Sequence, residues 1–139
     1  PAVGYRFDYR GRSVVVSGDS NVNGDTLKIV DGADLLLHDA LSLPTVTALS
    51  EAMATVGQSR QSKIVSDVMD YHASTDSLIE LGEKSNVDMV AFYHLVPVPL
   101  NSVLEDIFKR GVPDNFLLAE DLMWFELPIG SDDIVVNRP

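Results

Sequence analysis

The stretch that decides the fold is residues 14–20, which read VVVSGDS. Three consecutive valines are typical of a strand buried on both faces, as in a parallel sheet covered by helices. Gly18 and Asp19 then predict the turn that ends this strand. Ligands of open α/β sheets bind beyond the carboxyl ends of the strands, so Asp19 is the first candidate for a functional residue.

The segments on either side predict alternating strands and helices. Residues 3–9 alternate apolar and polar side chains, which predicts a half-buried strand, and Gly11 supplies the turn into a second strand over residues 12–17. Two further buried strands are expected over residues 33–38 (ADLLLH) and 87–93 (VDMVAFY). Helices are expected over residues 26–30 and 44–56, from residue 61, over 75–84, and from Ser102, where Ser102 and Glu105 predict a capping box. Short closing strands are expected over residues 116–119 and 122–127.

This order of elements predicts an α/β protein with a mixed sheet and helices packed on it, in a single domain over residues 1–139. A chain of this length buries about two thirds of its unfolded surface. With 45% hydrophobic residues it has enough apolar material for such a core. No apolar run approaches the roughly 20 residues that span a bilayer, so we expect no membrane segment.

The net charge limits the classes of binding partner, and the cysteine content limits the kinds of covalent link and metal site. Ten Lys and Arg against 21 Asp and Glu give a net charge of -11, which disfavours nucleic acid and anionic membranes as partners. The absence of cysteine excludes disulfides and thiolate metal sites. The chain begins PAVGYRF without an initiator Met, as a fragment or a processed product would. A cytoplasmic location is the default expectation.

Three histidines are present, and their positions favour a site. His38 and His94 both follow apolar strand segments, as Asp19 does, and His72 lies in DYHAST between two expected helices. A single histidine in such a place is more often structural than functional. Three of them, together with Asp19 and Asp39, favour a cluster with chemistry.

Two local interpretations of Asp19 need no catalysis. In the first, Gly18-Asp19 is a turn whose carboxylate caps the next segment. In the second, Asp19, Asn21, Asn23 and Gly24 match the first half of a calcium loop. However, the twelfth position of that loop is Val30 instead of a bidentate Glu, and the segment before it is a strand rather than a helix.

A third interpretation makes Ser20 a nucleophile. The GDS triplet after a buried strand resembles the nucleophile block of the GDSL hydrolases, whose base comes from a late D-x-x-H motif. The residues three positions before the histidines are Leu35, Met69 and Ala91, so no histidine here has the required Asp. This disfavours a serine hydrolase.

A fourth interpretation covers most of the chain. The segments VVVSGDS, ADLLLHDA and DYHASTDSLIELGEKSNVDMVAFYHLVPVP, in this order, closely resemble the carboxyl-terminal half of the metallo-β-lactamase fold. The resemblance is to the branch that includes ribonuclease Z, related phosphodiesterases and arylsulfatase-like hydrolases, and it runs over residues 4–99. It implies half of an αββα sandwich whose amino-terminal half is absent.

The resemblance also implies a site. The family's GD aspartate, here Asp19, bridges two divalent metal ions, for which zinc is the favoured metal, and the late histidine before a proline, here His94, holds one of them. The acidic residue of the H-E-A segment and the histidine of the H-x-S segment, here Asp39 and His72, together deliver a proton to the leaving group. A carboxylate that orients an imidazole and stabilises its protonated form suits that role.

Two departures from the family pattern bear on activity. Asp39 replaces the usual Glu and is one methylene shorter, which puts its reach to His72 in question. The family's H-x-H-x-D-H signature and a further histidine ligand do not occur in these residues. Because a catalytic zinc takes three protein ligands, we expect metal binding by this chain alone to be weak or absent. His38 is expected to hold the strand end instead of a metal.

These features support two hypotheses. One is a metal-dependent hydrolase of a phosphodiester, sulfate or other small ester, incomplete and inactive as an isolated chain and dependent on a complementary amino-terminal half. The other is a non-catalytic binding or self-assembling module of the same fold. A half-domain exposes an apolar face, so we expect self-association into a homo-oligomer. The substrate and the identity of the metal are not determined by these residues.

Overall fold

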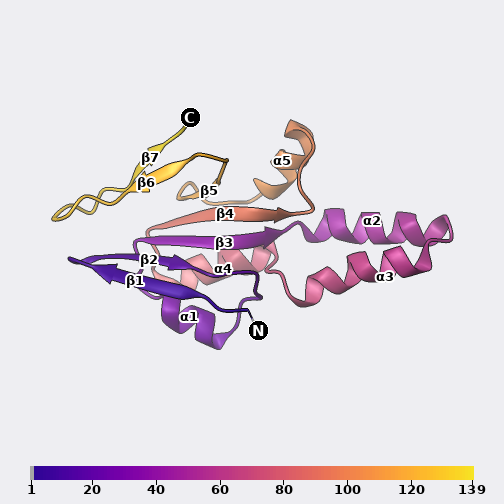
Figure 1. Ribbon diagram of the computed structural model, residues 1–139, viewed down its shortest axis with the longest axis horizontal. Helices are drawn as coiled ribbons and strands as arrows, with labels where there is room; N and C mark the ends of the chain where they lie inside the picture. Colours follow the sequence, from indigo (N-terminus) through magenta and orange to yellow (C-terminus); the bar gives the residue numbers. More distant parts are fainter. Residues whose placement is uncertain (1) are drawn as a thin grey trace.

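The computed structural model describes residues 2–139, and its elements alternate along the chain as shown in Figure 1. The strands are β1 (Tyr5–Tyr9), β2 (Arg12–Val16), β3 (Leu35–Leu41), β4 (Met89–Val96), β5 (Phe116–Leu118), β6 (Trp124–Glu126) and β7 (Val135–Asn137). The helices are α1 (Gly24–Val30), α2 (Leu43–Thr55), α3 (Ser59–Asp67), α4 (Thr75–Ser85) and α5 (Ser102–Phe108), with a 3-10 turn η1 (Val68–Asp70) after α3.

The central sheet has the strand order β1-β2-β3-β4-β5. β1 and β2 form an antiparallel hairpin, and β2 to β5 are parallel, so the expected α/β architecture with a mixed sheet is confirmed. Of the expected closing strands, only β5 joins this sheet. The segment expected over residues 122–127 becomes β6 and pairs with β7, a strand that the sequence analysis missed, in a separate two-stranded sheet.

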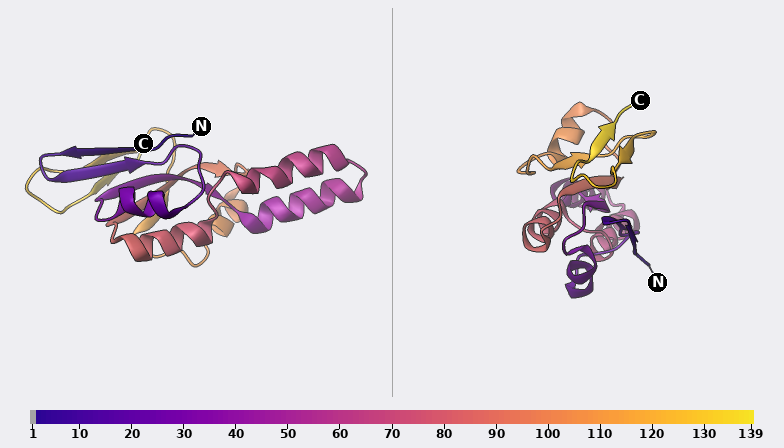
Figure 2. Two further views of the ribbon diagram at one scale, coloured as in Figure 1. Left: turned by 90° about the horizontal axis from the view of Figure 1, so that it is seen from below. Right: turned by 90° about the vertical axis from the view of Figure 1, so that its left-hand side faces the viewer.

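Helices α1 and α4 cover one face of the central sheet (Figure 2). Alternate residues of the parallel strands point to this side, where they meet apolar side chains of the helices. The cluster includes Val15, Val30, Leu36, Leu78, Leu81, Val90, Phe92, Phe108 and Phe116. The rings of Phe92 and Phe116 meet edge to face, with centroids 5.7 Å apart. This packing explains why valine and leucine runs form the middle strands.

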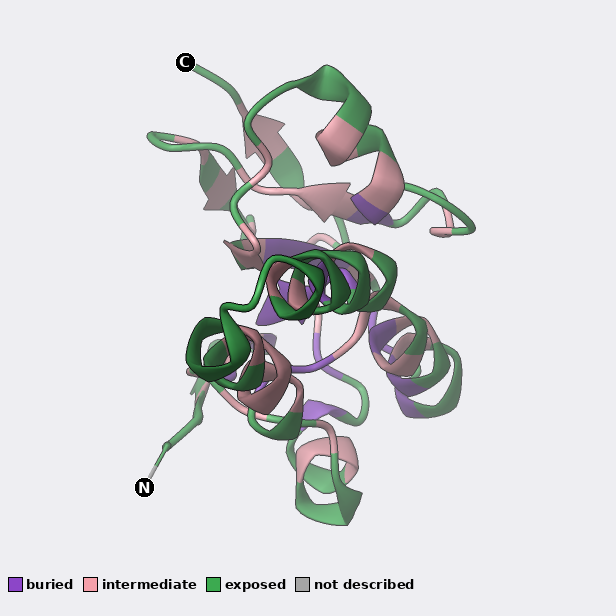
Figure 3. Ribbon diagram, turned by 90° about the vertical axis from the view of Figure 1, so that its right-hand side faces the viewer, coloured by how far each residue is buried: buried purple, intermediate pink, exposed green. Residues whose placement is uncertain are grey.

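Helices α2 and α3 form a hairpin that extends beyond the end of the sheet (Figure 1). Seen along its length, the hairpin is mostly exposed (Figure 3). Val46 is the buried residue of α2, and α3 buries none of its residues. The hydroxyl of Ser50 joins the two helices by donating to the carbonyl of Ser62 at 3.0 Å. None of the helices in residues 2–139 combines the length and apolar character needed to span a membrane.

Two details of the expected elements are wrong. The alternation over residues 3–9 predicts a half-buried strand, but Tyr5, Phe7 and Tyr9 are 58%, 59% and 66% exposed, because β1 is the edge strand and its aromatic side faces away from α1. The expected capping box from Ser102 does not form. Helix α5 is capped one residue earlier, by Asn101, whose side-chain oxygen accepts from the backbone N–H of Leu104 at 3.0 Å.

Helix α4 packs closely against β5 because residue 82 is a glycine. A Cβ atom added to Gly82 in α4 would overlap the ring of Phe116. We expect Gly82→Ala to lower the free energy of unfolding by about 1–3 kcal/mol, because overpacking forces the ring or the helix to shift. Urea unfolding measures the change. The control is Gly24→Ala in α1, where nothing lies within 4 Å, so stability should stay the same or rise by up to about 1 kcal/mol. Equal losses in both variants would contradict this packing.

Candidate functional site

Asp39 in β3 is the buried centre of the site. Its carboxylate accepts from Nδ1 of His72 at 2.7 Å and from the backbone N–H groups of Ser20 at 3.1 Å and Ala73 at 3.4 Å. Nδ1 of His38 lies 3.0 Å from its other oxygen. A 2.7 Å contact shows that the aspartate, although one methylene shorter than glutamate, reaches His72.

The environment keeps Asp39 ionised. Burial raises the pKa of this carboxyl, but the hydrogen bonds from His38, His72 and Ser20 act in the opposite direction and together outweigh it. The net pKa lies below the ordinary value of 3.8. A buried carboxylate with this set of donors is therefore a stable anion at neutral pH.

Asp19 follows β2 at a sharp turn that only glycine permits. Gly18 has a φ of 65°, and a Cβ atom there would lie 2.6 Å from the carbonyl oxygen of Val3. The turn leaves the Asp19 side chain half exposed, with Oδ2 3.9 Å from Nε2 of His94. The Gly-Asp pair therefore places a solvent-accessible carboxylate beside a histidine from a different strand.

His94 is brought to Asp19 by a bulge in β4. The β3–β4 register pairs Asp39 with Tyr93 but Ala40 with Leu95, so His94 is the extra residue. Its φ of 43° is unusual for a residue with a side chain. Bulges of this kind re-aim a side chain, often next to functional sites. The sequence predicted that His94 follows the end of its strand, but β4 continues to Val96. The bulge, and not the strand end, turns the imidazole toward Asp19.

His72 reaches the sheet because the start of α4 is tied to β3. The N–H of Leu41 donates to the carbonyl of Ala73 at 2.7 Å, which holds the preceding loop against the strand. The imidazole of His72 is nearly buried, and its ring stacks on that of His94 with centroids 5.3 Å apart and planes 16° apart. Since Nδ1 is engaged by Asp39, Nε2 is the nitrogen left for another partner.

His38 also contacts Asp39, but from inside the protein. It is fully buried in β3, with Nδ1 2.9 Å from the main-chain oxygen and 3.0 Å from a side-chain oxygen of Asp39. Among residues 2–139, nothing forms a hydrogen bond with its Nε2. This geometry agrees with a structural role in which His38 fixes the Asp39 carboxylate.

Tyr93 is a residue of the site that was not predicted from the sequence. This residue lies opposite Asp39 in the β3–β4 register, so both side chains point to the same face of the sheet. Burial raises the pKa of Tyr93, and the charges of Asp39 and Asp19 raise it further, against hydrogen bonds from Ser17 and Gly18 that lower it. No pattern in the chain marks Tyr93, because its proximity to Asp39 follows from strand register alone.

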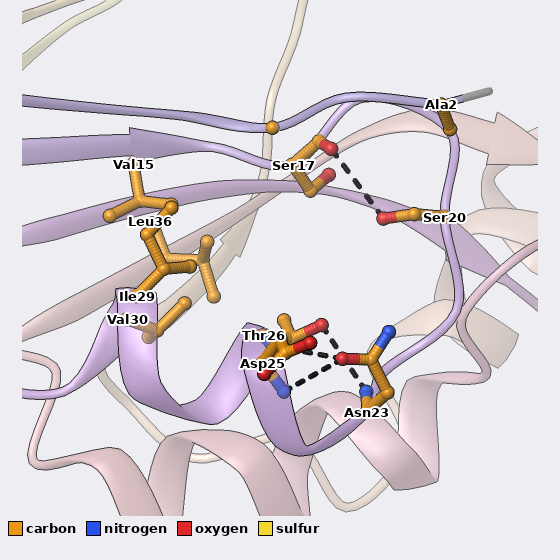
Figure 4. A pocket seen from close by; sticks show the side chains of 11 residues that line it. Ala2, Val15, Ser17, Ser20, Asn23, Asp25, Thr26, Ile29, Val30 and Leu36 are labelled. Carbon is orange, nitrogen blue, oxygen red and sulfur yellow. Dashed lines mark hydrogen bonds between the residues drawn. The ribbon is translucent and has the colours of Figure 1, made fainter.

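The competing interpretations of the GDS segment do not match the geometry (Figure 4). Asn23 is the cap of α1, not a calcium ligand: its side-chain oxygen accepts from the N–H groups of Asp25 at 2.8 Å and Thr26 at 3.1 Å. Asp19 does not cap the next helix either, because the N-cap of α1 is Asn23. The hydroxyl of Ser20 donates to the carbonyl of Ser17 at 3.5 Å, and no hydrogen bond within residues 2–139 joins it to a histidine.

Asp19 and His94 carry donor atoms that suit a metal ion. Carboxylate oxygen and imidazole nitrogen are both common zinc ligands. Within residues 2–139, however, no group of three or more His, Asp or Glu side chains is arranged to hold a metal ion. The donors are therefore chemically suitable but too few for a closed site.

A cleft of about 940 Å³ begins at His94 and runs between β5 and α5, bordered by Glu105, Lys109, Glu120 and Arg138.

Comparison with known proteins identifies similar chains. The sequence is 29% identical over 97 residues to the ribonuclease Z of Mycobacterium avium, which covers 70% of this chain and 31% of the relative. It is 30% identical over 98 residues to a putative ribonuclease Z of Mycobacterium tuberculosis, covering 70% of this chain and 38% of that protein. The chain thus spans about a third of the length of these relatives. No protein-family model matches it.

Two solved structures have a similar fold. The short form of human tRNase Z matches with a TM-score of 0.56 at 18% identity, over 91% of this chain and 38% of that one. The metallo-beta-lactamase fold protein YhfI from Bacillus subtilis matches with a TM-score of 0.54 at 14% identity, over 83% of this chain and 40% of that one.

The chain therefore has the fold of the metallo-β-lactamase superfamily, as the resemblance of its motifs implies. Its sequence is similar, over 70% of the chain, to a ribonuclease Z and to a putative ribonuclease Z.

The hydrogen bonds of Asp39 make stability depend on pH. Because its pKa is lower in the folded than in the unfolded chain, its contribution is fully present above the ordinary value of 3.8 and is lost as the pH falls through the folded pKa. We expect Asp39→Asn to lower the free energy of unfolding by about 2–4 kcal/mol at pH 7. This difference from the unmodified chain should shrink as the pH falls below 3.8.

Urea unfolding at a series of pH values measures this effect. Asp25→Asn is the matched control, because Asp25 is exposed and pairs with Lys28 on the surface of α1. That change should leave the unfolding curve at pH 7 nearly unaltered. An Asp39→Asn protein as stable at pH 7 as the unmodified chain would show that the buried carboxylate is not held as described.

Proposed function

We propose that this chain is the carboxyl-terminal half of a metal-dependent hydrolase, and that an amino-terminal half supplies the remaining metal ligands. The observation that carries the proposal is one continuous cluster: Asp39 bonds His72, His72 stacks on His94, and His94 lies beside Asp19. Its members come from four separate segments of the chain. Such convergence of titratable side chains at one edge of a parallel sheet is typical of an active site.

In this proposal Asp19 and His94 hold the metal. The two oxygens of Asp19 suit a bridge between two cations, and Nε2 of His94 suits a ligand to one of them. Bound metal would supply a hydroxide near neutral pH and polarise the ester under attack. The half exposure of both side chains leaves room for ligands from another segment and for a substrate in the adjoining cleft.

His72 and Asp39 then act on the leaving group. Asp39 holds Nδ1 of His72, which directs the other nitrogen, Nε2, away from the buried carboxylate. A fixed imidazole with a buried anion behind it can carry a proton to a departing alkoxide. Asp39 is therefore a positioning residue in this proposal, and His72 is the proton donor.

The names of the sequence relatives indicate a substrate class. They are named as ribonucleases, which favours a phosphodiester over a sulfate or carboxylic ester as the substrate class. The net charge of -11 argues against broad backbone contacts between this chain and RNA. Cationic contacts for a large RNA would then come from the other half, whereas a small phosphodiester needs only the cleft and the metals.

A second candidate is a non-catalytic module of the same fold. The observation in its favour is that residues 2–139 offer only two donors at the proposed metal site. The two candidates differ in one measurable property, which is tight metal binding by the protein expressed from its complete reading frame.

The test uses that full-length protein, with metal content by mass spectrometry and turnover of bis(p-nitrophenyl) phosphate. We expect about two zinc ions per chain, and Asp19→Ala and His94→Ala should each lose metal and at least 100-fold in kcat. His72→Ala should keep its metals but lose about 100- to 10,000-fold in kcat, because proton transfer is removed without a ligand.

Asp25→Ala, on the surface of α1, is the control and should behave like the unmodified protein. Full metal content and turnover in Asp19→Ala would refute the assigned ligand. A reading frame that begins at Pro1 and binds no metal tightly would support the non-catalytic module instead.

A further inference from the structure

Tyr71 is a half-exposed aromatic residue beside the proposed proton donor. It directly precedes His72 in the chain, and 49% of its surface is exposed. The centroid of its ring lies 5.0 Å from that of the His72 ring, with the planes 52° apart. Tyr71 has no part in the hydrolysis proposed above. Aromatic side chains commonly line the sites that hold small molecules, so this ring is a candidate contact for the substrate.

The position of His72 relates Tyr71 to the leaving group. Among the described residues, the His72 ring contacts both the ring of His94 and the ring of Tyr71, with centroids 5.3 Å and 5.0 Å away. A leaving oxygen that takes the proton of His72 must lie within hydrogen-bond reach of Nε2. A nucleoside attached to that oxygen is long enough to reach the neighbouring Tyr71 ring.

The main chain around Tyr71 is held on both sides. Its N–H donates to the carbonyl of Val68 at 3.3 Å, at the end of η1. The side-chain amide of Asn21, in the loop after β2, donates to the carbonyl of Met69 at 3.3 Å. Two residues after Tyr71, the carbonyl of Ala73 accepts from β3 at 2.7 Å. A ring on a fixed backbone loses little conformational freedom when a ligand binds, which favours binding.

Stacking is a contact that this acidic chain can offer to a nucleotide. The net charge of -11 disfavours recognition through the phosphate backbone, whereas an aromatic ring stacks on a nucleobase without any cation. Every nucleobase has a π face, and such stacking changes affinity about 5- to 100-fold per base. Tyr71 therefore suits the recognition of a base attached to the departing oxygen.

We propose that Tyr71 is a specificity-determining residue that stacks on the nucleobase of the leaving group, so that the preferred substrates are phosphodiesters with a nucleoside on the leaving side. This inference rests on the proposed hydrolase function and names the class of its leaving group. A hydroxide derived from water forms the new bond to phosphorus, the P–O bond to the nucleoside breaks, and the departing oxygen takes the proton of His72. Tyr71 itself forms and breaks no covalent bond.

The test compares substrates that differ only in a base, using the protein expressed from its complete reading frame. The substrates are a thymidine dinucleotide and two analogues, each with an abasic tetrahydrofuran sugar in place of one thymidine. Product analysis shows which sugar leaves without the phosphate. Loss of the base on the leaving side should lower kcat/KM about 5- to 100-fold, and loss of the other base should have little effect.

Variants of Tyr71 assign this preference to the ring. Tyr71→Ala should hydrolyse the dinucleotide no faster than the substrate that lacks the leaving-side base, and Tyr71→Phe should keep the preference because its ring also stacks. The control is Tyr9→Ala at the opposite end of the sheet, where the ring is 66% exposed, and it should keep the preference. Equal kcat/KM for all three substrates, or an unchanged preference in Tyr71→Ala, would overturn this inference and leave the proposed hydrolase function standing.

A binding measurement separates stacking from turnover. Calorimetry compares thymidine monophosphate with the same sugar phosphate without its base, and neither compound contains a phosphodiester to cleave. We expect the nucleotide to bind about 5- to 100-fold more tightly, with the difference lost in Tyr71→Ala. If no substrate is hydrolysed, the proposed function fails, but this Tyr71-dependent difference would still support the stacking contact. Equal binding of the two compounds would refute the contact as well.

Discussion

The buried carboxylate of Asp39 is the contact on which the arrangement of the site depends. It accepts hydrogen bonds from the loop after β2, from His72 and from the backbone of Ala73, the last of these 34 residues away from Asp39 in the sequence. A buried carboxylate that loses its hydrogen-bond donors costs free energy. Each donor is therefore held in its position. The backbone of Ser20, next to Asp19, and the ring of His72, next to His94, are thereby positioned through one side chain.

The second constraint is the shape of the strands. Gly18 allows β2 to turn sharply beneath Val3, and the bulge at His94 lets β4 present one residue out of register with β3. Both are local departures from regular strand geometry, and both occur at residues of the cluster. The positive φ of His94 costs of order 1–3 kcal/mol, which the surrounding sheet supports because β3 and β4 resume their pairing beyond the bulge.

The two faces of the central sheet differ in how far they are covered. One face is sealed by α1 and α4, whereas the aromatic side of β1 and the free strand edge remain exposed.

The sequence by itself determined the α/β class and most strands and helices, which follow from local causes: valine runs for buried strands, helical spacing for the helices, and glycine at the turn. The candidates Asp19, Asp39, His72 and His94 were chosen from the sequence as well, by the resemblance of its motifs to a known fold. The cap at Asn101, the β6–β7 pairing and the exposure of β1 were not predicted correctly, since they depend on competition between neighbouring caps and on which strands meet.

Only the tertiary structure decided that Asp39 reaches His72, that His38 contacts the same carboxylate from inside, and that Tyr93 lies opposite it. Strand register and a bulge set these distances, and both result from packing between segments that are distant in sequence.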